Sequence, residues 1–272
     1  MLKKLMKYEW KAVRNILLII NAFTVLSTVL GVIAINSLAS GKDTGEAFPS
    51  LVAVLLFVAY YATIIGVSFA MMIYIGIRFY RNLYTDEGYL MHTLPVTSRQ
   101  LVVSKLIVHS GCMLLTGVLI YASIIVLFLP VYIAFADETP SFVYALKDLY
   151  TECRNAFGLS LPRIFLCGIV ATVISTASGI LATYCAVSLG QMFRKHRIMG
   201  SILCYIAILC LIQTLTTVLL MPQMLLSMSG GSFDLSVYFN NVFLTTGIIS
   251  LFLGIAFYLI TLYLMNHKLN LD

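Results

Sequence analysis

The chain has 272 residues, of which 61% are hydrophobic and only 10% are charged, and its formal net charge is +6. Soluble domains carry about a quarter of charged residues, so this composition excludes an ordinary soluble globular protein and favours a bilayer as the solvent. The six cysteines show no C-x-x-C spacing. We therefore expect neither a disulfide framework nor a zinc site, and interpret the cysteines of the apolar stretches, all but Cys153, as small apolar residues.

Long uncharged stretches alternate with short charged ones, which predicts an all-α membrane protein because a span needs about 20 apolar residues. We expect a single transmembrane domain over residues 1–272, with six helices near 16–38, 50–77, 101–134, 161–190, 199–221 and 241–265. The third stretch exceeds one crossing, so Pro130 is expected to kink it or its end to project from the membrane. Outside the membrane we expect an amphipathic helix over Ser141–Phe157, begun by Thr139 and Pro140, and a loop or re-entrant element over Gln223–Asn240.

The distribution of lysine and arginine predicts the orientation, because positive residues collect on the cytoplasmic side. They gather at the N-terminus, in the second and fourth connections and at the C-terminus, as Lys3, Lys4, Lys7, Lys11, Arg14, Arg78, Arg81, Arg99, Lys105, Arg194, Lys195, Arg197 and Lys268. The opposite side mixes a few cations with most of the acidic residues. Both termini are therefore expected in the cytoplasm, which an even number of spans requires.

The predicted membrane interior contains His109 as its one ionisable side chain. Ion-coupled carriers usually keep charged residues at membrane depth, so this composition counts against them. We interpret His109 as a structural residue, and a proton relay is the alternative.

The N-terminal stretch 1–14 has the pattern of an amphipathic interfacial helix. At 100° per residue its cations fall on one face and its apolar residues fall opposite, with Trp10 at the flank. The basic face consists of Lys3, Lys4, Lys7, Lys11 and Arg14. We expect this helix to lie on an anionic cytoplasmic leaflet. Glu9 interrupts the apolar face, and either reaches the lipid headgroups or pairs with a basic residue of another element.

The connection from Arg78 to Leu101 contains the signals of a short, rigid cytoplasmic helix. Thr85 is expected to cap it, two acidic residues follow at its positive end, and Pro95 ends it. The run Thr97–Gln100 then has the capping-box pattern that opens the third spanning helix. The residues expected to form and surround the short helix are Asp86, Glu87, Tyr89, Leu90, Met91, His92, Leu94 and Pro95. A solvated loop is the alternative.

Small residues recur every four positions along the fourth spanning helix, which lets helices approach closely in lipid. One row consists of Ser178, Ala182, Ala186 and Gly190, and a second row consists of Ala171, Ser175, Gly179 and Thr183. The rows predict either packing within one subunit or a dimer face.

No motif of an enzyme occurs in the sequence. It lacks a phosphate-binding loop, a zinc-protease helix and a nucleophile elbow, and its four histidines are scattered. We expect a chain without catalytic residues, without a metal or cofactor of its own, and without a nucleic-acid surface.

Three stretches together resemble the membrane-spanning permease subunits of ABC-2 type ABC transporters, especially the small permeases of Firmicutes-type bacteria. They are Lys7–Lys11, Asp86–Thr97 and Leu101–Lys105. The resemblance implies that Asp86–Leu94 is the coupling helix that docks on a separate ABC ATP-binding subunit, and that Met1–Arg14 is the interfacial connecting helix. It also implies that ATP and Mg bind to that partner, that a second permease copy or paralogue completes the transporter, and that the chain lies in the bacterial cytoplasmic membrane.

The function expected from this resemblance is ATP-driven export of a hydrophobic or amphipathic substrate, such as a peptide, drug or lipid. Two other classes stay open. One is a secondary transporter or channel that acts alone, and the other is a membrane immunity or scaffold protein that transports nothing. Dependence on a co-purifying ATPase separates the ATP-driven permease from both of these classes.

Overall fold

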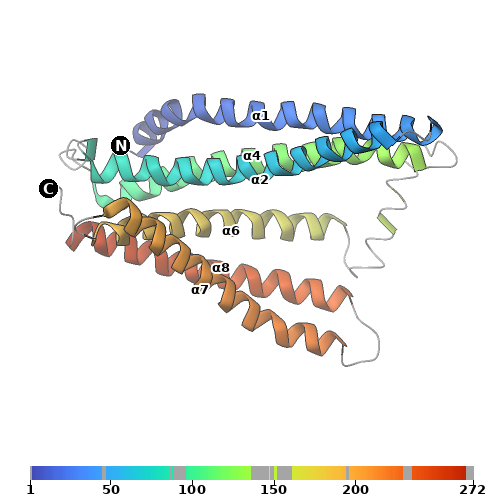
Figure 1. The fold of residues 1–272 in the computed structure, drawn as a ribbon. Coiled ribbons are helices and arrows are strands. Elements are labelled where there is room, and N and C mark those ends of the chain that lie inside the picture. The colour runs from blue at the N-terminus through green and yellow to red at the C-terminus, as the bar shows by residue number, and fades with distance from the viewer. Residues whose placement is uncertain are drawn as a thin grey trace. The chain divides into compact units, whose positions relative to one another are not determined.

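The structure is a computed structural model that describes residues 2–44, 47–85, 87–88, 96–135, 147, 150–151, 161–193, 196–228 and 235–267. Six long helices lie within these residues (Figure 1): α1 (Leu2–Thr44), α2 (Ala47–Tyr84), α4 (Ser98–Phe135), α6 (Leu161–Gly190), α7 (Arg197–Met228) and α8 (Leu235–His267). Each is long and apolar enough to cross a membrane. The chain is therefore an all-α membrane protein with six spans, as the hydropathy pattern predicts.

Several helices extend further than the sequence pattern predicts. The expected interfacial helix and the first span form one uninterrupted helix, α1. Helix α4 continues past Pro130 to Phe135. Helix α7 includes residues 223–228 and α8 begins at Leu235, so most of the stretch expected to be a loop or re-entrant element belongs to spanning helices. The expected helix over Ser141–Phe157 lies almost entirely outside the described residues.

Apolar side chains cover the outside of the helices, as expected for a protein surrounded by lipid. Val218 on α7 and Phe252 on α8 are each 68% exposed. In the most apolar 18-residue stretch of α7, only 6% of the residues are buried inside the protein. Apolar contact with hydrocarbon carries none of the cost that contact with water would, so these faces need no protein cover.

The helices group into two compact units. The first, called the N-terminal unit, contains Lys3–Ile75 and Gly111–Ser141, and the second, called the C-terminal unit, contains Gly76–Ser110 and Phe142–Asp272 together with the first two residues. Helices α2 and α4 therefore contribute one part to each unit. The single transmembrane domain stays a prediction.

The N-terminal unit is held by close approach of α1, α2 and α4. A Cβ atom added to Gly31 of α1 would lie 2.5 Å from Leu127 Cδ1 of α4 and 3.3 Å from the ring of Tyr60 of α2. The Tyr60 hydroxyl lies 2.9 Å from Ser123 Oγ, and because Ser123 donates to the Ile120 carbonyl, Tyr60 is the donor. Gly31 thus leaves room for Tyr60 and Leu127, which form a core together with Ile35.

Helix α6 is central to the C-terminal unit, where it packs on α7 and α8 and is contacted by the end of α2 (Figure 1). The first row of small residues makes these contacts and is buried throughout. Ser178 Cβ would lie 3.4 Å from a Cβ atom added to Gly254 of α8, and an atom added to Gly190 would lie 2.5 Å from Ser201 Cα of α7. These contacts lie within one chain.

Candidate functional site

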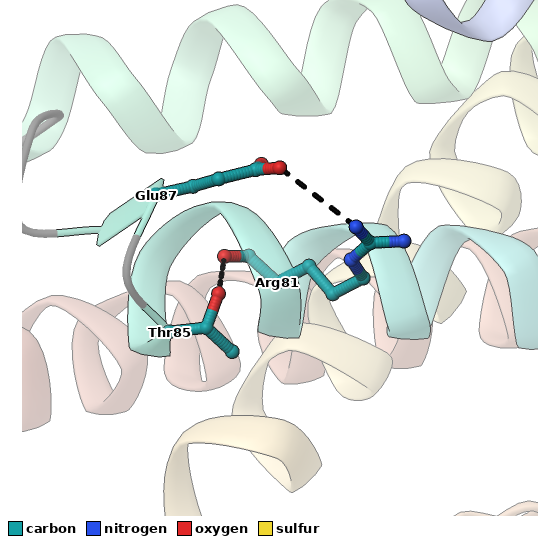
Figure 2. A network of polar contacts seen from close by, with 3 residues as sticks. All are labelled: Arg81, Thr85 and Glu87. Carbon is teal, nitrogen blue, oxygen red and sulfur yellow. Dashed lines mark hydrogen bonds and ion pairs between the residues drawn. The ribbon is translucent and has the colours of Figure 1, made fainter.

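The candidate site is the connection that follows α2, where the described residues include Thr85, Glu87 and Gly88. Helix α2 ends at Tyr84. The Thr85 hydroxyl donates to the Arg81 carbonyl one turn earlier, so it satisfies the C-terminal end of α2 (Figure 2). Residues 87 and 88 are helical, and the predicted capping of a short helix by Thr85 stays a prediction. The Gly88 amide donates to the Thr85 carbonyl at 2.7 Å and closes a turn over these residues.

Gly88 has no room for a side chain in this turn. A Cβ atom there would lie 2.5 Å from the carbonyl oxygen and 2.6 Å from the carbonyl carbon of Leu83. Both are backbone atoms, which no side-chain rotation can move away. The glycine therefore allows the connection to fold back closely onto the last turn of α2.

The predicted capping of α4 by Thr97 is confirmed, and the return bond from the Gln100 side chain stays a prediction. Helix α4 begins at Ser98, and Thr97 Oγ1 accepts a hydrogen bond of 3.4 Å from the Gln100 amide. The Thr97 carbonyl also accepts from the Leu101 amide at 3.2 Å. The Thr97 hydroxyl thus satisfies one of the amides that a helix N-terminus leaves without partners, and its carbonyl accepts the first regular bond of the helix.

Glu87 makes one exposed and one buried set of contacts. Its Oε1 lies 3.9 Å from Arg81 Nη2, with both side chains more than half exposed, so water screens this ion pair strongly (Figure 2). Its Oε2 faces the Asn82 side chain, which is only 4% exposed. The second contact has the greater effect on the position of Glu87, because a buried hydrogen bond competes less with water.

Asn82 connects Glu87 to Lys105 of α4. Its Nδ2 donates to Glu87 Oε2 at 2.7 Å, and its Oδ1 accepts from Lys105 Nζ at 2.8 Å. A carboxylate only accepts and an ammonium only donates, which fixes the orientation of the amide. We call this chain of contacts the Asn82 bridge. All three residues belong to the C-terminal unit.

Lys105 is the main residue of the site whose burial sequence reasoning missed. It counted among the cytoplasmic cations of the second connection, and its side chain is 2% exposed. Helical spacing contains a signal that could have located it, because Lys105 lies four residues from both Leu101 and His109, which are buried. Burial of a lysine is costly unless its charge is compensated, and the Asn82 bridge supplies a hydrogen bond and a nearby carboxylate.

One turn further along α4, His109 is fully buried beside Tyr184 of α6. Its Nδ1 and the Tyr184 hydroxyl share a hydrogen bond of 2.5 Å. The Tyr184 ring stacks on Phe79 of α2 with 3.9 Å between centroids. The Tyr84 hydroxyl donates to Ser188 Oγ on the same side of α6 at 2.8 Å. This arrangement agrees with a structural histidine, and no local sequence pattern indicated its tyrosine partner.

The remaining residues of the expected coupling helix lie outside the described residues. They are Asp86, Tyr89, Leu90, Met91, His92, Leu94 and Pro95. The structure therefore describes the support of this segment, namely Glu87, Gly88 and the ends of α2 and α4.

The predicted interfacial residues occupy the first turns of α1. The basic face is exposed to the surroundings at Lys3, Lys4, Lys7, Lys11 and Arg14, and Trp10 is 39% exposed. Glu9 is only 6% exposed, which speaks against a carboxylate directed toward lipid headgroups. The exposed cations suit contact with anionic headgroups.

This site can hold charges in fixed positions, and it presents a carboxylate at the end of two spanning helices. The described residues contain no group of three or more histidine, cysteine or acidic side chains that could hold a metal. Comparison of the chain with protein-family models, with curated proteins and with solved structures finds no match.

Proposed function

We propose that this chain is the permease subunit of an ATP-driven transporter of the ABC-2 type, coupled to a separate ATP-binding subunit. The observation that carries the proposal is the segment Asp86–Thr97, whose sequence resembles the coupling segment of such permeases. The geometry around it supports this reading. A connection that only returns the chain to the membrane needs no buried polar support, whereas Glu87 is tied through Asn82 to a lysine that is 2% exposed.

The energy source fits this proposal. If transport is driven by ATP, a permease chain without a phosphate-binding loop needs a partner that binds ATP and Mg. Closure of two such partners would move two permease subunits, supplied by a second copy or a paralogue, between two conformations. The apolar spans favour a hydrophobic or amphipathic substrate such as a peptide, drug or lipid, exported across the bacterial cytoplasmic membrane. The basic face of α1 would contact the cytoplasmic leaflet.

One observation favours a second candidate, a carrier driven by an ion gradient. Lys105 and His109 are buried within the α4 span, and buried ionisable residues are typical of proton relays. Both lie in its first turns, however, and both have hydrogen-bond partners on neighbouring helices.

A detergent pull-down of the tagged chain, followed by mass spectrometry and an ATPase assay, tests the proposal. We expect the wild-type chain to recover an ATP-binding subunit, and the variant Tyr89→Ala/Met91→Ala to lose it. The matched control is Tyr121→Ala, because Tyr121 is 65% exposed on α4 and lies far from the segment in sequence. This control should recover the ATPase as well as the wild type does.

The outcomes separate the candidate functions. Recovery of the ATPase by both variants would keep the permease and place the docking surface elsewhere on the chain. No ATPase with the wild-type chain would refute the permease. Substrate uptake or efflux driven by a proton gradient alone, in vesicles that contain only this chain, would then establish the carrier, and its absence would leave the immunity or scaffold protein.

A further inference from the structure

Helix α7 carries an exposed amide side chain, Gln213, at membrane depth. The α7 span runs from Arg197 to Pro222. At a rise of about 1.5 Å per residue, Gln213 lies about 5 Å from the midpoint of the span. Its carboxamide has no hydrogen-bond partner among the residues that the structure describes. The apolar side chains of α7 need no cover in lipid, but an amide in hydrocarbon requires a polar partner.

The two exposed threonines beside Gln213 do not share this need. The hydroxyls of Thr214 and Thr217 donate to the carbonyls of Cys210 and Gln213, each at 2.8 Å. Their protons are therefore satisfied within α7. A glutamine amide has two N–H donors and one carbonyl acceptor, so a second glutamine offers the complementary set. Two such amides that face each other can exchange two hydrogen bonds.

Gln213 belongs to a row along the uncovered face of α7. The helix packs on α6 and α8, and its buried Ile208 lies on the opposite side from this row. Steps of four and three residues in alternation are the spacing by which two helices pack along a shared seam. The row follows this spacing, and all its members are exposed: Met199, Leu203, Ile206, Cys210, Gln213 and Thr217. A single amide in such a seam fixes the register of paired helices.

We propose that a second copy of this chain covers this row, and that the two Gln213 amides pair where the copies meet. Both copies have the same orientation in the membrane, so a two-fold axis along the membrane normal sets their α7 helices parallel. Each residue near the axis then faces its own counterpart, which brings identical amides together. A different chain would fit only if it carried an amide at the same depth.

This inference does not rest on the proposed function, because neither ATP nor an ATP-binding subunit enters it. It concerns the chain by itself, and its tests use the chain without a partner ATPase.

Cysteine cross-linking in membranes tests which face of α7 meets the second copy. In a chain whose native cysteines are replaced, Thr217→Cys lies in the row, whereas Val218→Cys lies at nearly the same depth but about 100° around the helix. Val218 is 68% exposed, and Thr217 is exposed as well, so both thiols point out of the unit. We expect oxidation to give a covalent dimer with Thr217→Cys and to leave Val218→Cys monomeric.

Substitution of Gln213 itself tests the amide pair. Gln213→Leu suits lipid contact, so this variant should fold. We expect the dissociation constant of its dimer, measured by energy transfer between labelled copies in detergent, to rise about tenfold, because hydrogen bonds between membrane helices are lost. Gln213→Asn keeps an amide and should stay closer to the wild type. The control Thr172→Leu removes a hydroxyl that bonds within α6 and should leave the dissociation constant unchanged.

The outcomes either support or overturn the inference. Covalent dimers with neither cysteine variant would show that something other than a second copy covers the row, and equal yields from both would show random encounter. An unchanged dissociation constant in Gln213→Leu would overturn the amide pair. A dimer through α7 would support this inference even if no ATPase accompanied the chain, and an ATPase without such a dimer would leave the proposed function standing.

Discussion

At the scale of single residues, Gly88 determines how tightly the connection folds against α2. An added Cβ atom would lie 2.5 Å from the Leu83 carbonyl oxygen, so the backbone itself must move. We expect Gly88→Ala to cost about 1–3 kcal/mol of local stability, as overpacking usually does. The thermal denaturation midpoint and the recovery of an ATP-binding subunit should both decrease.

The control for this substitution is Gly66→Ala on α2, where an added Cβ atom meets nothing within 4 Å. Alanine favours a helix by about 1 kcal/mol over glycine, so this variant should be as stable as the wild type or more stable. Equal midpoints for the alanine variants at positions 88 and 66 would show that the connection does not need its close approach.

Tyr184 makes a second prediction at this scale, because its hydroxyl and its ring have separable contacts. Tyr184→Phe keeps the stack on Phe79 and removes the hydrogen bond to His109 Nδ1. Loss of a buried hydrogen bond should destabilise the protein by about 1–3 kcal/mol, measured by denaturation in detergent. Tyr121→Phe removes a hydroxyl from a side chain that is 65% exposed and should have no effect. Equal loss in both would contradict the buried contact.

At the scale of helices, hydropathy was sufficient to predict all six spans, because a bilayer requires long apolar helices whatever their partners are. It located their ends less well. Residues 2–14 are amphipathic and charged, so their pattern predicts a separate helix. In the structure they form the first turns of α1, which continues without a break into the span. Residues 223–228 likewise extend α7, because Pro222 does not end it.

The candidate site was predictable only in part. Thr97 was correctly predicted as a cap because its partners are within four residues in sequence. The contacts of Lys105 with Asn82 and of His109 with Tyr184 join different helices. Local pattern contains no information about which helix face meets which neighbour, so these pairs could not be read from one sequence.

The row of small residues on α6 provides a prediction at the scale of helices. A Cβ atom on Gly190 would lie 2.5 Å from both Ser201 N and Ser201 Cα, whereas one on Gly179 of the second row meets nothing within 4 Å. We expect Gly190→Ala to force α6 and α7 apart and to lower stability by about 1–3 kcal/mol. Gly179→Ala in the same helix should be tolerated. The denaturation midpoints of both variants check this, and the reverse order would contradict the packing.

At the scale of the whole molecule, the charge distribution predicts that the connection between α6 and α7 is cytoplasmic. Cysteine labelling tests this in a variant whose native cysteines are replaced. Met192→Cys, at a position that is 52% exposed, should react with a membrane-impermeant maleimide only after the cells are opened. Asn241→Cys, at the first residue of the α8 span and on the side predicted to face outward, should react in intact cells. The opposite labelling pattern would invert the predicted orientation.

The Asn82 bridge has a consequence for biosynthesis. A ribosome makes the chain from its N-terminus, so Asn82 and Glu87 emerge before Lys105 does. A lysine at the centre of a membrane helix costs about 2.5–3.5 kcal/mol during insertion, and Lys105, in the first turns of α4, carries a smaller cost of the same kind. Because its amide and carboxylate partners are already in place at the end of α2 when α4 enters the membrane, the newly made Lys105 finds its compensation at once.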